Sequence, residues 1–154
     1  MQGEFYARSA ICETLARYTR FGDSADFEGV ASQFADDGVL RTADAASQGR
    51  DEIVRYLHQA ADRFTGHEVL WPFRHHVSSV YVDVVDDQCA HARSYFVVMS
   101  REGPDHWGRY DDQLVHRGAR WLFQLRHVTV ESSKDNSPMA HLVAARGSTP
   151  PNKR

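Results

Sequence analysis

The sequence has few cysteines, little excess charge of either sign and no long hydrophobic run. Cys12 and Cys89 are its only two cysteines, and neither belongs to a paired-cysteine motif, so neither a disulfide framework nor a zinc ribbon is expected. The net charge of −3 and the scattered arginines argue against a surface for nucleic acid or an anionic membrane. No apolar stretch reaches transmembrane length, and the first residues contain no apolar signal-peptide core. We therefore expect one cytoplasmic domain.

Motifs that bind cofactors and metals are missing too. The sequence has no Gly-x-Gly-x-x-Gly or phosphate-binding loop and no His-Glu-x-x-His motif. Its nine histidines include the adjacent pair His75 and His76, but neighbouring strand residues point to opposite faces and are poorly placed to chelate one ion. We expect neither a metal nor an organic cofactor.

The first half of the chain shows helical periodicity. Apolar residues recur every three or four positions over 4–21, over 25–35 and from 48 to 64, which predicts three helices. Between the second and third helices, a turn at 36–38 and a short strand at 39–43 are expected.

After Pro72 the pattern changes to alternation of apolar and polar residues, which is typical of half-buried strands. Helices followed by a meander predict an α+β fold, with three N-terminal helices packed on a curved, mainly antiparallel sheet. The domain is expected to span residues 1–134, followed by a tail (135–154) whose last residues are disordered. The expected strands are 74–85, 89–100, 106–117 and 120–132.

The first of these strands carries a candidate catalytic histidine. Valines alternate with other residues over 80–84, and this parity carried back places His76 on the valine side, facing the interior, with His75 on the opposite face. A one-residue bulge would exchange the two. A histidine at the mouth of an apolar strand face can act as a general acid or base, or can simply be a core histidine bonded to a backbone carbonyl.

Asp23, which follows the first helix, is the carboxylate that could orient His76, as in other pairs of a base and an orienting acid. An alternative role for Asp23 is to cap the second helix, with Asp26 three residues further on completing a capping box. Ser24 could cap that helix in its place.

Four further residues are candidates for the wall of the same pocket: Tyr18, Tyr110, Asp112 and Arg126. Tyr110 could donate a hydrogen bond to a substrate oxygen or be a buried packing residue. Asp112 and Arg126, on neighbouring expected strands, could form a structural ion pair, or Arg126 could bind an anionic or carbonyl group. Tyr18 could belong to the pocket or to the core. The aromatic residues Phe96, Trp107, Trp121 and Phe123 would make the cavity largely apolar and suited to a cyclic molecule.

The order of these segments resembles the SnoaL-like branch of the nuclear transport factor 2-like superfamily, whose members are cone-shaped α+β barrels. Relatives include scytalone dehydratase, ketosteroid isomerase and hexachlorocyclohexane dehydrochlorinase. The resemblance covers residues 8–132 and is carried by the segments 15–18, 23–26, 34–39, 75–78, 108–112 and 120–123.

The resemblance also implies roles for individual residues. In dehydratase-like members, a catalytic Asp follows the first helix and a catalytic His opens the strand after the third helix, at positions that match Asp23 and His76. The dehydrochlorinase has an active-site arginine on its last strand, where Arg126 lies. Scytalone dehydratase uses a second histidine where this chain has Ser100 or Arg101, and a Ser/Asn pair near Gly108 and Tyr110, which argues against scytalone itself as substrate.

The resulting hypothesis is a cofactor-independent lyase or isomerase, with dehydration the first choice and other elimination or isomerisation close behind. Asp23 and His76 would catalyse proton transfer on a small, mostly apolar cyclic or steroid-like substrate. The alternative is a non-catalytic binding or assembly module, such as the small subunit of a ring-hydroxylating dioxygenase, which would not need an inward Asp/His pair. A homodimer is expected through the outer face of the sheet, where His91, Arg93 and Tyr95 should lie.

Overall fold

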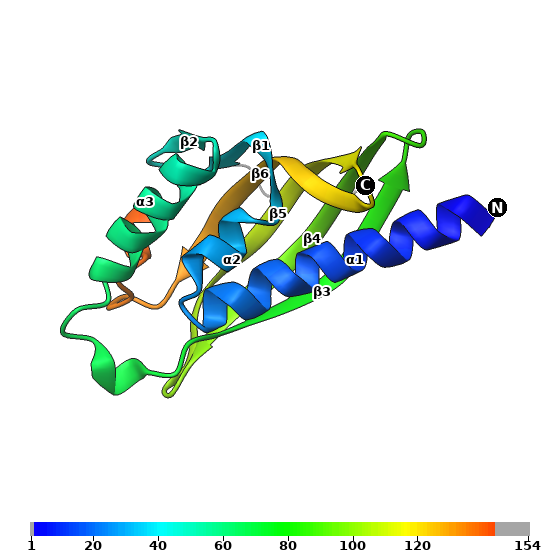
Figure 1. Cartoon of the computed structure of the whole chain (residues 1–154). Helices are drawn as coiled ribbons and strands as arrows, with labels where there is room; N and C mark the ends of the chain where they lie inside the picture. The colour runs from blue at the N-terminus through cyan, green and yellow to red at the C-terminus, as the bar shows by residue number, and fades with distance from the viewer. Residues whose placement is uncertain (1, 144–154) are drawn as a thin grey trace.

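The computed structural model describes residues 2–143, in which three helices pack on one face of a curved, unclosed six-stranded sheet (Figure 1). The long helix α1 runs across the sheet, and α2 and α3 follow at its C-terminal end. The helices are α1 (Gln2–Asp23), α2 (Phe27–Ala31) and α3 (Arg50–Asp62), with two short 3-10 turns, η1 (Glu68–Leu70) and η2 (Ala140–Leu142). None of the helices in residues 2–143 is long and apolar enough to span a membrane.

The strands lie in the order β2-β1-β6-β5-β4-β3, and every neighbouring pair is antiparallel except β1 and β6. The four long strands form the predicted meander, with ends close to those expected from the alternation. The α+β class and the mainly antiparallel sheet are confirmed. The strands are β1 (Phe34–Arg41), β2 (Ala46–Gln48), β3 (Arg74–Val84), β4 (Cys89–Ser100), β5 (Gly103–Arg117) and β6 (Arg120–Ser133).

The predicted second helix over 25–35 was too long. Helix α2 ends at Ala31, and β1 begins at Phe34, five residues earlier than the strand expected at 39–43. Phe34 pairs in parallel with Phe123 of β6, and the expected turn at 36–38 lies in the irregular part of β1 between Phe34 and Val39. The apolar spacing before Phe34 also fits a helix, so only the non-local pairing with β6 decides that Phe34 belongs to a strand.

Residues 135–143 pack against the sheet. Leu142 is buried, and Val143 forms a parallel bridge with Val130 of β6. The residues 144–154, where disorder was expected, lie outside the described part of the chain.

A buried ion pair lies in the core beneath the helical layer. Arg126 donates two hydrogen bonds to Asp112, from Nε to Oδ1 at 2.9 Å and from Nη2 to Oδ2 at 2.7 Å. The guanidinium carbon also lies 4.1–4.2 Å from the ring centres of Tyr18, Tyr110 and Phe123. Planar stacking and a bidentate carboxylate satisfy a guanidinium better than they would an ammonium group.

Removing one partner of this pair should destabilise the folded protein much more than removing both. Asp112→Leu leaves a buried, unpaired guanidinium and should lower the free energy of unfolding by about 3–5 kcal/mol, the typical cost of breaking a buried pair. The double variant Asp112→Leu/Arg126→Met removes both charges and should recover a large part of that loss. Urea denaturation measures both effects, and a double variant as unstable as the sum of the two single variants would contradict this account.

Candidate active site

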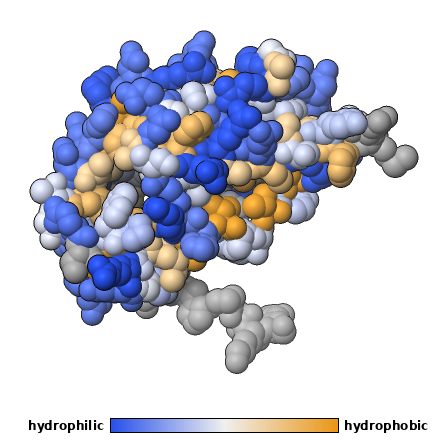
Figure 2. Space-filling view, turned by 60° about the horizontal axis from the view of Figure 1, so that its bottom comes forward, coloured by the Kyte–Doolittle hydropathy of each residue, from blue (hydrophilic) through white to orange (hydrophobic). Residues whose placement is uncertain are grey.

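A cavity of about 240 Å³ lies between the helices and the sheet. It lies at the end of the molecule away from the N-terminus of α1, where the surface is hollowed (Figure 2). Its wall is mostly apolar and aromatic, with a few polar groups that come from different elements. Among the lining residues are Tyr18, Asp23, Leu57, Phe64, His75, Phe96, His106, Tyr110, Val128, Met139 and Leu142.

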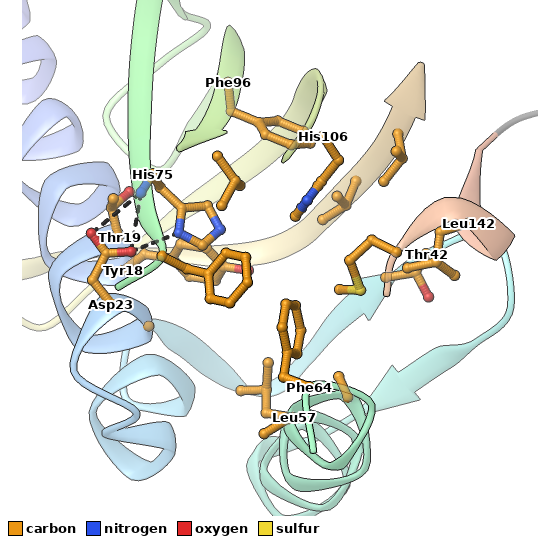
Figure 3. A pocket seen from close by; sticks show the side chains of 18 of the residues that line it. Tyr18, Thr19, Asp23, Thr42, Leu57, Phe64, His75, Phe96, His106 and Leu142 are labelled. Carbon is orange, nitrogen blue, oxygen red and sulfur yellow. Dashed lines mark hydrogen bonds and ion pairs between the residues drawn. The ribbon is translucent and has the colours of Figure 1, made fainter. Parts of the chain in front are cut away.

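Asp23 and His75 form a hydrogen-bonded pair at the edge of this cavity (Figure 3). The His75 Nδ1 lies 2.7 Å from Asp23 Oδ1, and the backbone N–H of His75 donates to the same carboxylate, at 3.1 Å to Oδ1 and 3.3 Å to Oδ2. The His75 side chain is 28% exposed and the Asp23 side chain 16%, so solvent and a ligand can reach the pair.

The pair determines the tautomer of the imidazole. An ionised carboxylate only accepts hydrogen bonds, so Nδ1 of neutral His75 carries the proton that is donated to Asp23. The lone pair is therefore on Nε2, on the side of the ring that faces the cavity (Figure 3). This is the arrangement of a general base whose orientation is set by a carboxylate.

The inward-facing histidine is His75, and the prediction that His76 faces the interior is wrong. His76 is exposed, whereas His75 is half-buried and lines the cavity. The register of β3 against β4 shifts between Ser78 and Tyr81, and Ser79 has a φ of 52°. This bulge inserts a residue, so the inward parity of the valines does not carry back to the start of the strand.

Asp23 does not cap the second helix. The N-cap of α2 is Asp26, whose side chain accepts a hydrogen bond from the backbone N–H of Gly29 at 2.8 Å. The alternative role considered for Asp23 is thus filled by another residue, and the Asp23 carboxylate binds His75 instead.

A second imidazole, His106 of β5, lines the same cavity and was missed in the sequence (Figure 3). Its Nδ1 lies 2.8 Å from Oδ2 of Asp105, a fully buried carboxylate that also accepts a 2.6 Å hydrogen bond from Ser137 Oγ. The Lys134 ammonium lies 3.6 Å from the other oxygen, Oδ1. The strand expected at 106–117 leaves Asp105 outside it, whereas β5 begins at Gly103 and includes both Asp105 and His106.

Burial decides the charge of His106. Desolvation lowers the pKa of His106, and the nearby His75 lowers it further, although the hydrogen bond with Asp105 acts in the opposite direction. Burial alone would raise the pKa of Asp105, but hydrogen bonds from His106 and Ser137 outweigh burial and lower it. At neutral pH the site therefore holds a carboxylate and a neutral imidazole with Nδ1 protonated.

The remaining predicted site residues divide into two groups. Tyr18 and Tyr110 line the cavity, and burial raises the pKa of both hydroxyl groups, so they remain hydrogen-bond donors. Asp112 and Arg126 do not line the cavity. Their ion pair lies behind the wall, with the guanidinium packed on the rings of Tyr18 and Tyr110.

The polar groups do not form a recognisable metal site. Within residues 2–143, no group of three or more His, Cys, Asp or Glu side chains is arranged to hold an ion. Each imidazole of the cavity is paired with its own carboxylate, so the chemistry available in this arrangement is proton transfer and hydrogen bonding.

The chain is similar to proteins of known structure along most of its length. A family profile described as SnoaL-like domain matches residues 4–127, and no curated protein matches. A candidate scytalone dehydratase from Novosphingobium aromaticivorans shares 23% identity over 99% of this chain and 98% of its own, with a TM-score of 0.74. ActVI-ORFA from Streptomyces coelicolor shares 23% identity over 80% and 97%, with a TM-score of 0.69. A Catenulispora acidiphila protein, solved in complex with S-DNPA, shares 26% identity over 80% and 92%, with a TM-score of 0.67.

The neutral state of His106 should make stability depend on pH. Because its pKa is lower in the folded protein than the ordinary 6.5, the unfolded chain binds a proton first as the pH falls. The free energy of unfolding should therefore decline from pH 6.5 down to the folded pKa, by up to about 1.4 kcal/mol per pH unit from this group.

His106→Asn keeps an N–H near the Nδ1 position for Asp105 but cannot titrate, so its stability should fall less steeply over that interval. Urea denaturation at pH 7.5, 6.5 and 5.5 measures the two slopes. Identical slopes for the variant and the original protein would contradict the assignment of a neutral His106.

Proposed function

The chain belongs to the SnoaL-like domain family, and we propose that it is a cofactor-independent lyase or isomerase that uses Asp23 and His75 to transfer a proton on a small cyclic substrate. The observation that carries this proposal is the Asp23–His75 hydrogen bond at the edge of a largely apolar cavity. The base is His75 because its neighbour His76 lies on the exposed face.

The proposed reaction is a dehydration next to a carbonyl group. Nε2 of His75 takes a proton from the α-carbon, and the electrons of that C–H bond form the new C=C bond while the β-hydroxyl group leaves. The imidazolium returns the proton to the departing oxygen, so that the products are an enone and water. The Asp23 carboxylate stabilises the imidazolium between the two steps, and acid–base help of this kind is worth roughly 10²–10⁴-fold in rate.

Two tyrosines can assist at the carbonyl oxygen. Tyr18 and Tyr110 line the cavity, and burial keeps their hydroxyl groups protonated. A hydroxyl group that donates to the carbonyl oxygen would stabilise negative charge that develops there. Arg126 and Asp112 would act through these residues, because the guanidinium packs on both tyrosine rings and makes no contact with the cavity.

The size of the cavity limits the substrate class. An apolar cavity of about 150 Å³ accommodates benzene. A cavity of about 240 Å³ therefore takes a substituted ring or two fused rings, and a longer molecule only if it extends out of the opening. The candidate scytalone dehydratase and the relative bound to S-DNPA support a small organic ligand.

The non-catalytic alternative is less well supported. An assembly subunit has no need of a half-buried carboxylate that holds one tautomer of a cavity histidine. A module that only binds a ligand would retain the cavity, but it would catalyse no reaction that the loss of a proton-transfer group could slow.

The dyad can be tested with a matched pair of histidine variants. On one-ring and two-ring β-hydroxy ketones, such as 3-hydroxycyclohexanone and its benzo-fused analogue, His75→Gln and Asp23→Asn should each lower kcat by about 10²–10⁴-fold, because the base or its orientation is lost. His76→Gln, on the exposed face of the same strand, should keep the original rate. Ultraviolet absorbance of the conjugated product follows the reaction.

Equal activity of His75→Gln and His76→Gln would exclude the proposed mechanism. Failure of the unmodified protein to convert any member of the ketone series, or to exchange their α-protons in D2O, would exclude dehydration and isomerisation of this substrate class.

We also propose that the chain forms a homodimer through the outer face of the sheet. His91, Arg93 and Tyr95 alternate on the exposed side of β4, and Tyr95 is 57% exposed. Light scattering should then give twice the mass of one chain. Tyr95→Glu should shift the protein towards monomer, whereas Phe5→Glu, an equally drastic change at an exposed residue of α1, should not. A monodisperse monomer for the unmodified protein would contradict the proposal.

A further inference from the structure

The proposed reaction uses one of the two imidazoles in the cavity and leaves His106 without a role. We infer that His106 is a specificity residue that accepts a hydrogen bond from a hydroxyl group of the ligand, so that the cavity selects hydroxylated rings over their methoxy and unsubstituted analogues. This inference concerns the same cavity as the proposed function and rests on its being the ligand site.

The first step is the position of the acceptor. Nδ1 of His106 is occupied by its hydrogen bond to Asp105, so the lone pair of the neutral ring is on Nε2. His106 is 5% exposed and lies near Phe96 in the wall of the cavity (Figure 3). Tyr110 lines the same cavity. A ligand in the cavity would therefore meet an acceptor nitrogen that is surrounded by aromatic side chains.

The second step is that the orientation of Asp105 is itself fixed. Ser137 donates to Oδ2, the oxygen that also binds His106, and the Lys134 ammonium lies on the side of Oδ1. Lys134 is held in turn by Glu102 at 3.1 Å. Ser137 and Lys134 both lie beyond residue 127, where the match to the family profile ends, and they hold a carboxylate that is 0% exposed.

The third step is the charge of the ring. The titratable groups that face His106 are Asp105 on its own strand and His75 on β3, while Lys134 faces the Asp105 carboxylate. Burial and His75 hold the pKa of His106 below its ordinary value, so the ring is neutral near pH 7 and accepts at Nε2. A cationic ring would instead donate there and would prefer a carbonyl or ether oxygen.

The ligand must therefore carry a hydroxyl donor that reaches His106 while its reacting carbon lies near His75. A ligand without this hydroxyl group would leave the buried acceptor unpaired, and sites built to bind a hydroxyl group reject analogues that lack one.

Binding of three probes tests this without any need for turnover: 2-naphthol, 2-methoxynaphthalene and naphthalene, measured by titration calorimetry at pH 7.5. The protein should bind 2-naphthol at least about tenfold more tightly than either analogue, because only 2-naphthol satisfies the acceptor. His106→Asn keeps the hydrogen bond to Asp105 and should lose this preference. The exposed histidine variant His91→Asn should keep it.

Asp105→Asn tests the role of Asp105 as a positioning residue. Lys134 should hold the amide oxygen on its side, so that the amide N–H2 group faces His106 Nδ1 and forces the proton onto Nε2. The acceptor in the cavity then becomes a donor, so the preference for 2-naphthol over 2-methoxynaphthalene should fall at least about tenfold. Binding of 1-tetralone, a ketone acceptor, should strengthen. A merely structural role for Asp105 would weaken all the probes alike.

The inference is overturned if the unmodified protein binds 2-naphthol no better than its analogues, or if His106→Asn keeps the preference. Loss of the preference in His75→Gln alone would assign the acceptor to the other imidazole and overturn it as well. If His106→Asn behaves as expected but no β-hydroxy ketone is converted, then the binding role of His106 stands and the proposed reaction fails.

Discussion

The carboxylate of Asp23 connects the helical layer to the sheet at the edge of the cavity. It ends helix α1 and accepts both the ring N–H and the backbone N–H of His75, at the start of β3. The ring contact orients the imidazole, and the backbone contact holds the strand end against the helix. If this link is broken, the wall of the cavity remains but the His75 imidazole is neither oriented nor kept in one tautomer.

The two imidazoles of the cavity follow the same design with different surroundings. Each donates from Nδ1 to its own carboxylate, which leaves the lone pair of the neutral ring on Nε2. The pair of His75 is partly open to solvent. The pair of His106 is buried and is held by Ser137 and Lys134, which suits a group that keeps one protonation state. The surroundings, and not the residue types, distinguish the two pairs.

The Asp112–Arg126 ion pair shows why proximity to a cavity does not make a residue part of the site. Both residues were candidates because they lie on neighbouring expected strands, where they could form an ion pair or Arg126 could bind a group of the ligand. The structure places them one layer deeper, where Arg126 packs on Tyr18 and Tyr110 and holds these aromatic rings in the wall. Whether an inward side chain reaches a cavity depends on what packs in front of it, and that is a property of the assembled layers.

The sequence by itself determined the fold class and the long strands, because local periodicity and turn residues carry that information. The partnership of Asp23 with a histidine at the start of β3 was implied by the family resemblance, since the local pattern around Asp23 fits a helix cap equally well. Tertiary structure decided which histidine faces inward, since the bulge at Ser79 depends on pairing with β4. It also decided that Phe34 belongs to a strand, through its pairing with β6, and it brought Asp105 together with Ser137 and Lys134. Each of these depends on contacts between residues far apart in the chain, or on a register shift that such contacts impose, and alternation along one strand contains neither.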